Sequence, residues 1–455
     1  MRALLLISAL LPAFLARADA VDEYVQERMR QLRLPGVAVA IVRDGQPADI
    51  RAYGLADLEN EVPVTAETVF ELGSVTKQFT ATAVMILAEE GKLALDKPAR
   101  AYLPELPPSW QDITVRHLLT HSSGIQEYLS VKGLPDEAHA LDHRAMTRLF
   151  AARVKREFAA GDTWAYSNTG YLLLGDIIER VSGTSYWTFL DERLFRPAGM
   201  THTRSSAPQA LIRRRASGYG WRDGAFENRP ALSENAYSAG AIASTIADMA
   251  KWEAAMQKGA LLSPAGWRAL WTPLRLSSGG APPLNYAFGW VADRERGRRA
   301  VLHSGGTPGF SSAIRRYADD GLAVIVLANH GDRILDHMPL EIAGLVHPAV
   351  ARRRAAESEP ERSRVVNAAL RGLLSGTPDL TLFTPEMRLF LGTATGKGLW
   401  EWVASHGDLK ALAYHQTETA DGLQTLRYRA TLGEAELWLS FAFTEDGKLA
   451  QVYWW

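Results

Sequence analysis

The stretch ELGSVTKQFT, residues 71–80, opens a run of helix-forming residues that continues to Gly91. It places Ser74 and Lys77 three residues apart, and on a helix this spacing puts two side chains on one face, about 5–6 Å apart. A serine needs a base to become a nucleophile, and burial can lower a lysine pKa far enough for that role. Free N–H groups at a helix start also favour developing negative charge. Taken alone, the pattern is better explained by an ordinary helix start with a solvated lysine.

Two further motifs carry groups that would complete such a pair. Tyr-Ser-Asn at 166–168 precedes a helix predicted over 171–183. Its tyrosine can relay a proton when a lysine ammonium holds it near ionisation, and its asparagine can donate to a substrate amide. His-Ser-Gly-Gly at 303–306 ends a predicted strand. Its small residues admit a substrate backbone, and a backbone N–H there can stabilise an oxyanion. Singly, each motif is also explained by packing or by a strand-to-turn transition.

Composition excludes several other classes of function. The 455 residues are 47% hydrophobic and 22% charged, as in ordinary globular proteins, and the length predicts two or three domains. A net charge of −1 gives no attraction for nucleic acid or an acidic membrane surface. The chain has no cysteine, which excludes disulfides, a thiolate nucleophile and cysteine metal sites. We expect no cofactor, and the oligomeric state stays open.

The first 20 residues have the pattern of a secretory signal peptide. Arg2 is followed by the apolar run ALLLISALLPAFL and then by Ala-Arg-Ala-Asp-Ala. We predict cleavage after Ala20, a periplasmic or secreted protein, and no transmembrane segment in the mature chain. An uncleaved membrane anchor is the alternative, although the apolar run is shorter than the roughly 20 residues that a span needs.

The pattern of elements predicts an α/β catalytic region over residues 21–350. A hairpin is expected at 37–54, strands recur over 284–330, and helices lie between them and at 335–347. Strands at both ends with helices between predict one antiparallel sheet flanked by helices, with a mainly helical subdomain inserted.

A separate small unit is expected at residues 365–455, after a charged linker at 351–364. Apolar residues alternate with polar ones along 426–432 and again along 437–443, which predicts an antiparallel sheet with one apolar face. The unit is rich in tryptophan. We interpret this as packing and docking on the catalytic region, with a role in shaping the substrate site as the alternative.

Together the three motifs resemble the serine β-lactamase and penicillin-binding-protein superfamily, whose set is S-x-x-K, S-D-N and K-T-G. The Y-x-N form at 166–168 is similar to class C β-lactamases, and the H-x-G form at 303–305 is similar to their esterase and S12-type peptidase relatives. The resemblance covers roughly residues 22–350. It implies a sheet flanked by helices with an inserted helical subdomain, and the C-terminal unit resembles β-rich domains appended to some of these hydrolases.

The resemblance also implies a role for each matching residue. Ser74 is the nucleophile that accepts the acyl group, and Lys77 and Tyr166 share the general base and acid work. Asn168 orients the substrate. The N–H groups of Ser74 and Gly306 hold the oxyanion.

His303, with Ser304 and Gly305, lies on the implied substrate-binding strand, where many relatives have lysine. A neutral histidine offers less to a substrate carboxylate than a permanent cation does. This departure favours an exported esterase or D-amino-acid-type peptidase over an efficient β-lactamase. The alternative is a penicillin-recognising sensor or scaffold that does not turn over.

Two rival patterns are weaker. Gly-Phe-Ser-Ser-Ala at 309–313 nearly matches the nucleophile elbow G-x-S-x-G, but a strand pattern follows where an elbow needs a helix. His139 and His143 with Asp142 could present metal ligands on one helix face. We interpret these three residues as a solvated helix face.

Overall fold

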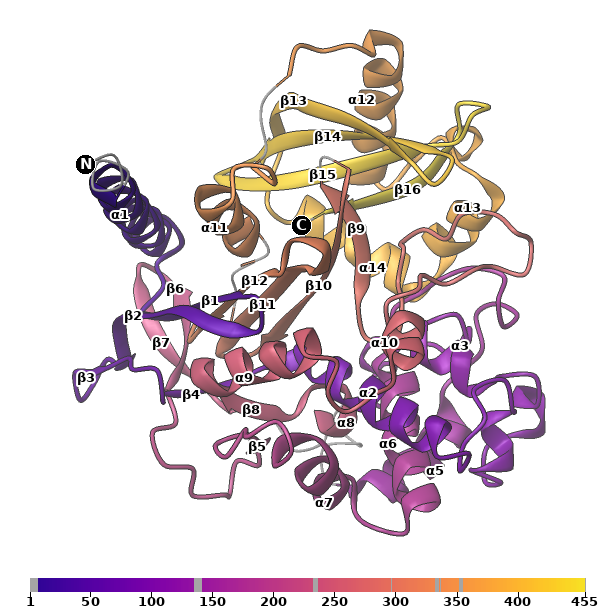
Figure 1. The fold of residues 1–455 in the computed structure, drawn as a ribbon. Coiled ribbons are helices and arrows are strands. Elements are labelled where there is room, and N and C mark those ends of the chain that lie inside the picture. Colours follow the sequence, from indigo (N-terminus) through magenta and orange to yellow (C-terminus); the bar gives the residue numbers. More distant parts are fainter. Residues whose placement is uncertain are drawn as a thin grey trace.

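A seven-stranded antiparallel sheet forms the centre of the first 350 residues (Figure 1). The computed structural model describes residues 7–134, 141–231, 236–295, 297–331, 335, 337–351 and 355–454. The prediction that strands from both ends form one sheet is confirmed: four strands come from the end of the region and three from its start, one more than the predicted hairpin. In spatial order they are β3 (Val62–Pro63), β2 (Gln46–Asp57), β1 (Gly36–Arg43), β12 (Leu322–Ala328), β11 (Phe310–Tyr317), β10 (Arg298–Thr307) and β9 (Val291–Glu295).

Strand β1 is apolar from Gly36 to Val42 because both of its faces are covered there. Val37, Val39 and Ile41 pack in one cluster with α1 (Ile7–Leu32) and α11 (His337–Val346). The alternate residues of β1 face the opposite cluster, which contains α9 (Ile246–Gln257). The sheet therefore lies between two helical layers, in agreement with the predicted fold class.

The predicted hairpin at 37–54 is confirmed. Asp44 and Gly45 join β1 to β2 with φ of 49° and 70°, the two positive values that a tight hairpin turn requires. The predicted strand at 284–293 is wrong over its first part, because β9 begins only at Val291. Gly289, with φ of 76°, lies against the backbone of Lys77, where a Cβ would come within 2.6 Å of Lys77 O, so the chain bends here before β9 begins.

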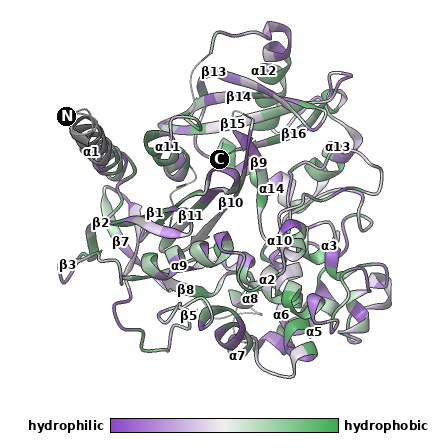
Figure 2. Cartoon of the chain, in the orientation of Figure 1, coloured by the Kyte–Doolittle hydropathy of each residue, from purple (hydrophilic) through white to green (hydrophobic). Residues whose placement is uncertain are grey.

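The inserted region is mainly helical, as predicted. Helix α2 (Thr76–Glu89) runs through its centre, and every side chain from Thr76 to Leu87 is buried. Hydrophobic residues are concentrated along the neighbouring helix α6 (Asn168–Ser182), as Figure 2 shows. The other helices of this region are α3 (Val115–Leu119), α5 (His143–Arg153), α7 (Tyr186–Leu190), α8 (Tyr237–Gly240) and α10 (Pro264–Leu270).

Two small sheets complete the catalytic region. One has three strands in the order β4 (Val69–Glu71), β8 (Ile242–Thr245) and β5 (Arg204–Ser205). The other pairs β6 (Gly218–Arg222) with β7 (Ala225–Arg229). Strand β4 leads directly into the turn that holds Ser74, so its pairing with β8 positions that turn.

The C-terminal unit combines a four-stranded antiparallel sheet with helices. The predicted linker is shorter than expected, since α12 (Pro360–Leu374) begins with a proline in its first turn. Arg352–Arg354 of that linker lie outside the described residues. The remaining elements are α13 (Pro385–Gly392), α14 (Ala394–Ala404), β13 (Leu409–Ala420), β14 (Leu423–Leu432), β15 (Ala435–Phe443) and β16 (Leu449–Trp454).

The apolar face of this sheet covers part of the catalytic region. The alternation along 426–432 and 437–443 is confirmed, and the two rows pair directly, with Leu426 opposite Phe441. Their cluster also contains Trp164 and Tyr286 of the catalytic region. The C-terminal unit is therefore docked, which agrees with our interpretation from the sequence.

Helix α1 passes without a break through the predicted cleavage point after Ala20. From Val21 onward its apolar side chains pack against the central sheet. Among the described helices, none combines the length and the apolar character needed to cross a bilayer.

Candidate active site

The turn that carries Ser74 packs directly against strand β10. Residues Gly73–Val75 form one 3-10 turn ahead of α2, and Gly73 has φ of 52°. A Cβ on Gly73 would lie 2.7 Å from Gly306 N, and one on Gly305 would lie 2.0 Å from Leu72 O. Only glycine at both positions allows this approach. The glycines of the third motif thus bring β10 against the serine.

Lys77 is fully buried and contacts three groups. Its Nζ donates to Asn168 Oδ1 and to Ala239 O, both at 2.7 Å, and lies 3.1 Å from Ser74 Oγ. The first two are acceptors only. A neutral amine has two N–H groups and one lone pair, so this geometry leaves the lone pair for the Ser74 hydroxyl proton. The predicted serine–lysine contact is therefore present in the structure.

Burial lowers the pKa of Lys77 from its usual range to about 7, while the nearby Glu127 carboxylate acts in the opposite direction. Burial disfavours the charged form of an amine. A pKa near neutrality makes a lysine an efficient general base at ordinary pH.

The rate of acylation is therefore expected to rise as pH passes through about 7, because only the neutral form of Lys77 can accept the serine proton. With an unperturbed lysine, whose pKa is ~10.4, the rise would occur at a pH about three units higher. The measurement is kcat/KM for an uncharged ester between pH 5 and 10. A profile that rises only above pH 9 would contradict a lowered Lys77 pKa.

Tyr166 is the second side chain that contacts the serine hydroxyl. Its hydroxyl donates to Ser74 Oγ at 2.7 Å, and Lys77 Nζ lies 4.7 Å from its ring centroid. Burial raises the pKa of Tyr166, and the Glu127 carboxylate adds to that rise. The sequence suggested a tyrosine held near ionisation by the lysine. In the structure Tyr166 is instead a protonated donor.

His303 is buried and neutral. Burial and the neighbouring Lys77 lower its pKa to about 3. Its Nδ1 lies 2.6 Å from the carbonyl oxygen of Ser304, which can only accept, so that nitrogen carries the proton. Its Nε2 accepts from the Tyr286 hydroxyl at 2.8 Å. His303 therefore carries no positive charge, and both of its ring nitrogens already form hydrogen bonds within the protein.

The backbone groups predicted to hold an oxyanion lie at one junction. A Cβ on Gly305 would be 2.8 Å from Ser74 N, and one on Gly73 would be 2.7 Å from Gly306 N. Ser304 and Gly305 are partly exposed and Gly306 is exposed, so this end of β10 is open to a substrate.

Three residues at the site were not found from the sequence. Glu127 accepts from Asn168 N and, at 3.3 Å, from Asn168 Nδ2. His121 accepts from Ser167 N at 3.1 Å and lies against the Tyr166 ring, 4.3 Å between centroids. Tyr286 orients His303. Glu127 and Asn168 are 41 residues apart in the chain, and nothing in local sequence indicates such a contact.

The C-terminal unit touches the loop that carries Tyr166. Thr395 Oγ1, at the start of α14, donates to the carbonyl oxygen of Tyr166 at 3.0 Å. The preceding residue, Ala394, donates its backbone N–H to Glu157 Oε1 at 2.7 Å. Docking of the unit thus contributes to holding this loop in place.

The rival nucleophile is excluded by its position. Ser311 is buried within β11, and its Oγ donates to His330 O at 2.7 Å. The residues after Ser311 continue strand β11 and do not begin a helix, so the rejection of a nucleophile elbow at 309–313 is confirmed.

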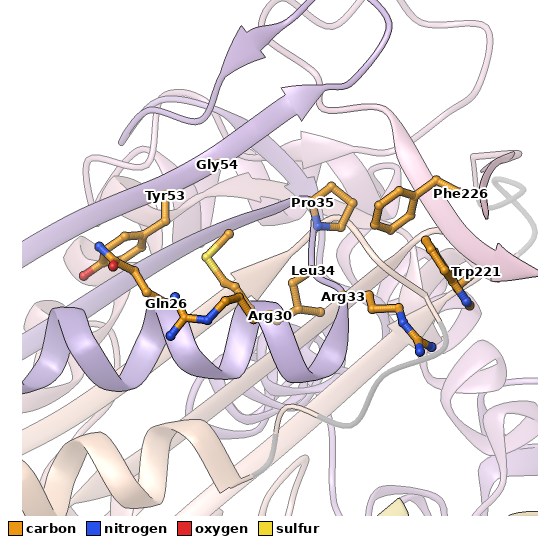
Figure 3. Close-up of a pocket in the computed structure, with 10 residues that line it drawn as sticks. Gln26, Arg30, Arg33, Leu34, Pro35, Tyr53, Gly54, Trp221 and Phe226 are labelled. Carbon is orange, nitrogen blue, oxygen red and sulfur yellow. The ribbon is translucent and has the colours of Figure 1, made fainter. Parts of the chain in front are cut away.

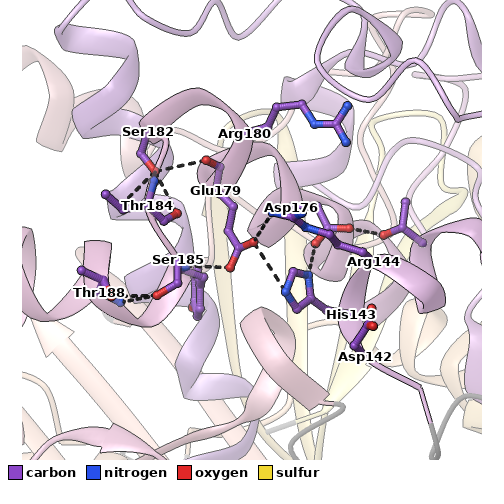
Figure 4. A network of polar contacts seen from close by, with 12 residues as sticks. Asp142, His143, Arg144, Asp176, Glu179, Arg180, Ser182, Thr184, Ser185 and Thr188 are labelled. Atoms are coloured by element: carbon purple, nitrogen blue, oxygen red, sulfur yellow. Dashed lines mark hydrogen bonds and ion pairs between the residues drawn. The ribbon is translucent and has the colours of Figure 1, made fainter.

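The described residues of the rival metal pattern have other partners. His143 pairs with Asp176 at 2.5 Å and stacks on Tyr237, so our interpretation of a solvated helix face is wrong for this residue. Figure 4 shows its ring between the carboxylates of Asp176 and Glu179. Asp142 caps α5, and His139 lies outside the described residues. No group of three or more His, Cys, Asp or Glu side chains is placed to hold a metal within the described part of the chain.

A separate open hollow of about 600 Å³ lies between α1 and the β6–β7 hairpin (Figure 3). The Arg33 guanidinium stacks 4.7 Å over the Trp221 ring there. None of the candidate site residues lines it. Its lining residues are Gln26, Met29, Arg30, Arg33, Leu34, Pro35, Tyr53, Gly54, Trp221 and Phe226.

Comparison with known proteins identifies the catalytic region. The model of the Beta-lactamase family matches residues 21–349. The chain belongs to this family. Membership confirms the resemblance based on the three motifs, and it covers the whole region between the predicted signal peptide and the C-terminal unit.

Relatives within the family extend the match. Penicillin-binding protein 4* of Bacillus subtilis (strain 168) is 30% identical over 429 residues, 87% of this chain and 90% of the relative. D-aminopeptidase of Gluconobacter oxydans (strain 621H) is 28% identical over 324 residues, 70% of this chain and 59% of the relative. The solved structure of the octameric penicillin-binding protein homologue from Pyrococcus abyssi has a TM-score of 0.63 at 21% identity, covering 94% of this chain and 97% of its own. That match shows that the C-terminal unit also belongs to a recurring fold.

Proposed function

We propose that the chain is a serine hydrolase that cleaves an ester, amide or peptide bond through an acyl-enzyme on Ser74. The observation that carries this proposal is the arrangement around Lys77. Two acceptors bind the two N–H groups of the neutral amine, and its lone pair is left for the proton of the Ser74 hydroxyl, whose oxygen is 3.1 Å away. A lysine held in this way can act as the base for the serine. The proposed reaction needs no cofactor.

Acylation begins when Lys77 takes the proton of Ser74 and Oγ bonds to the carbonyl carbon of the substrate. The carbonyl oxygen becomes an oxyanion, which the N–H groups of Ser74 and Gly306 stabilise. As the bond to the leaving group breaks, Tyr166 donates its phenolic proton to the departing alcohol or amine. Tyr166 then takes the proton that Lys77 holds, so the leaving group departs neutral and both residues return to their starting forms.

Deacylation repeats these steps with water as the nucleophile. Water loses a proton to Lys77 or Tyr166 and attacks the acyl carbon, and Ser74 regains its proton as the ester bond breaks. We assign the orientation of the substrate to Asn168, whose Oδ1 accepts from Lys77 and whose Nδ2 donates to Glu127.

The neutral His303 supports an esterase or D-amino-acid-type peptidase over an efficient β-lactamase. A penicillin or a C-terminal peptide presents a carboxylate, and the buried, neutral ring gives that group no charged partner. The similarity to a D-aminopeptidase agrees with this direction.

We also propose that residues 1–20 are a cleaved signal peptide and that the mature protein is periplasmic or secreted. The family match starts at residue 21, directly after the predicted cleavage point, which supports this boundary. The catalytic region then spans 21–350, with the C-terminal unit after it.

Burst kinetics with a chromogenic ester test the proposed function. We expect a burst near one equivalent of leaving group, followed by turnover, and an acyl mass increase on the peptide that contains Ser74. A burst without turnover would favour the non-turnover sensor. An acyl adduct on another residue would overturn the proposed nucleophile.

A further inference from the structure

Glu127 places a carboxylate beside the proposed nucleophile. It lies in the segment between α3 and α5, and its Oε2 accepts from the backbone N–H of Asn168 at the start of α6. Its Oε1 accepts from Asn168 Nδ2 and from Leu129 N, both at 3.3 Å. The Asn168 amide separates Glu127 from Lys77, so the carboxylate is one side chain away from the base.

The contacts of Glu127 are those of an ionised carboxylate without a counter-ion. All of its hydrogen-bond partners are N–H donors, which suit an acceptor-only group. Among the residues that the structure describes, no Lys, Arg or His lies within ion-pair distance of it. Burial raises its pKa, as expected for a carboxylate that lacks a cation.

The rest of the site contributes little positive charge. His121 and His303 are buried, and burial holds the pKa of each below its usual range. Lys77, with a pKa of about 7, is mostly neutral at pH 8. Glu127 is the acidic side chain beside this group of residues, and its three N–H contacts favour its ionised form, which attracts a cation.

The same residues are accessible to a substrate. Ser74, Glu127, Tyr166 and Asn168 are all partly exposed, although most of their neighbours are buried. We propose that Glu127 binds the free α-ammonium of the acyl residue, which makes the enzyme selective for substrates with an unblocked amino terminus. This inference rests on the proposed function, because the ammonium must belong to the acyl group that Ser74 accepts.

The position of an α-ammonium explains why this group fits. It is separated from the acyl carbon by one carbon atom, so it stays near Ser74 while the leaving group departs. A cation there also disfavours protonation of Lys77, which keeps the base neutral. Glu127 offsets the cost of removing the ammonium from water.

The test compares two substrates with one leaving group: alanine benzyl ester and N-acetylalanine benzyl ester, each in both stereochemical forms. We expect wild type to prefer the free amine by about 10- to 100-fold in kcat/KM, the range of a hydrogen bond to a charged group. Glu127→Gln should remove most of this preference. Glu89→Gln is the matched control, since Glu89 also accepts from a backbone N–H, that of Ser263, at the far end of α2.

A second measurement applies even if Glu127→Gln fails to fold. In wild type, kcat/KM for alanine benzyl ester should fall again above the pKa of its amino group, about 8, whereas the acetylated ester should show no such fall. Equal kcat/KM for the two esters, or a preference for the acetylated one, would overturn the inference.

Two further outcomes separate the alternatives. If N-acetyllysine benzyl ester is preferred over N-acetylalanine benzyl ester in a manner that needs Glu127, the carboxylate binds a side-chain ammonium and the α-ammonium assignment is wrong. The uncharged chromogenic ester reports on the proposed function independently. Normal burst kinetics with that ester, combined with no amine preference, would remove only the role of Glu127.

Discussion

Ser74→Ala is expected to lower kcat for a chromogenic ester on the order of 10³-fold or more and to abolish the burst. No other hydroxyl takes its place, because Lys77 and Tyr166 both direct their polar groups at Ser74 Oγ, at 3.1 and 2.7 Å. The fold should be retained, since the side chain is partly exposed. The measurement is stopped-flow kinetics on both proteins, with circular dichroism to check folding.

Ser311→Ala is the matched control for this substitution. It removes the same hydroxyl from the serine of the rival pattern at 309–313, which lies buried in β11. We expect activity within a few-fold of wild type and a loss of about 1 kcal/mol in stability, because one buried hydrogen bond to His330 O disappears. A folded Ser74→Ala variant with unchanged kcat would refute the assignment of Ser74.

Arg427→Met is expected to lower the free energy of unfolding by about 3–5 kcal/mol. Arg427 reaches from β14 of the C-terminal unit to Asp293 and Glu295 on β9, at 3.0 and 3.1 Å, and Arg315 of β11 binds the same carboxylates. All four side chains are at least 95% buried. Loss of one cation leaves two buried carboxylates facing a single guanidinium.

The measurement is urea denaturation followed by tryptophan fluorescence, and we expect the transition of the C-terminal unit to move to lower urea. Arg429→Met is the control on the same strand, because Arg429 is 52% exposed and lies 3.8 Å from Glu436. An exposed pair at this distance contributes about 0–1 kcal/mol. Equal effects of the two substitutions would contradict a stabilising role for the buried cluster.

Local rules were sufficient for much of the fold. The Asp44-Gly45 turn, the Gly183 stop of α6 and the Thr245 cap of α9 each depend on neighbours within a few residues, and all three are present. The start of β9 could not be predicted from local sequence. Gly289, just before it, lies against the backbone of Lys77, and this contact joins segments that are far apart in the chain.

The sequence by itself predicted the contact between Ser74 and Lys77, because residues three apart at a helix start share one face, although the pattern alone also fitted a solvated lysine. It also indicated that two more motifs complete the site. Only the tertiary structure decided the electrostatics: a neutral His303, a protonated Tyr166 and a Glu127 carboxyl that has no ion-pair partner among the described residues and whose pKa is raised by burial. Protonation depends on burial and on partners far away in the chain, and both exist only after folding.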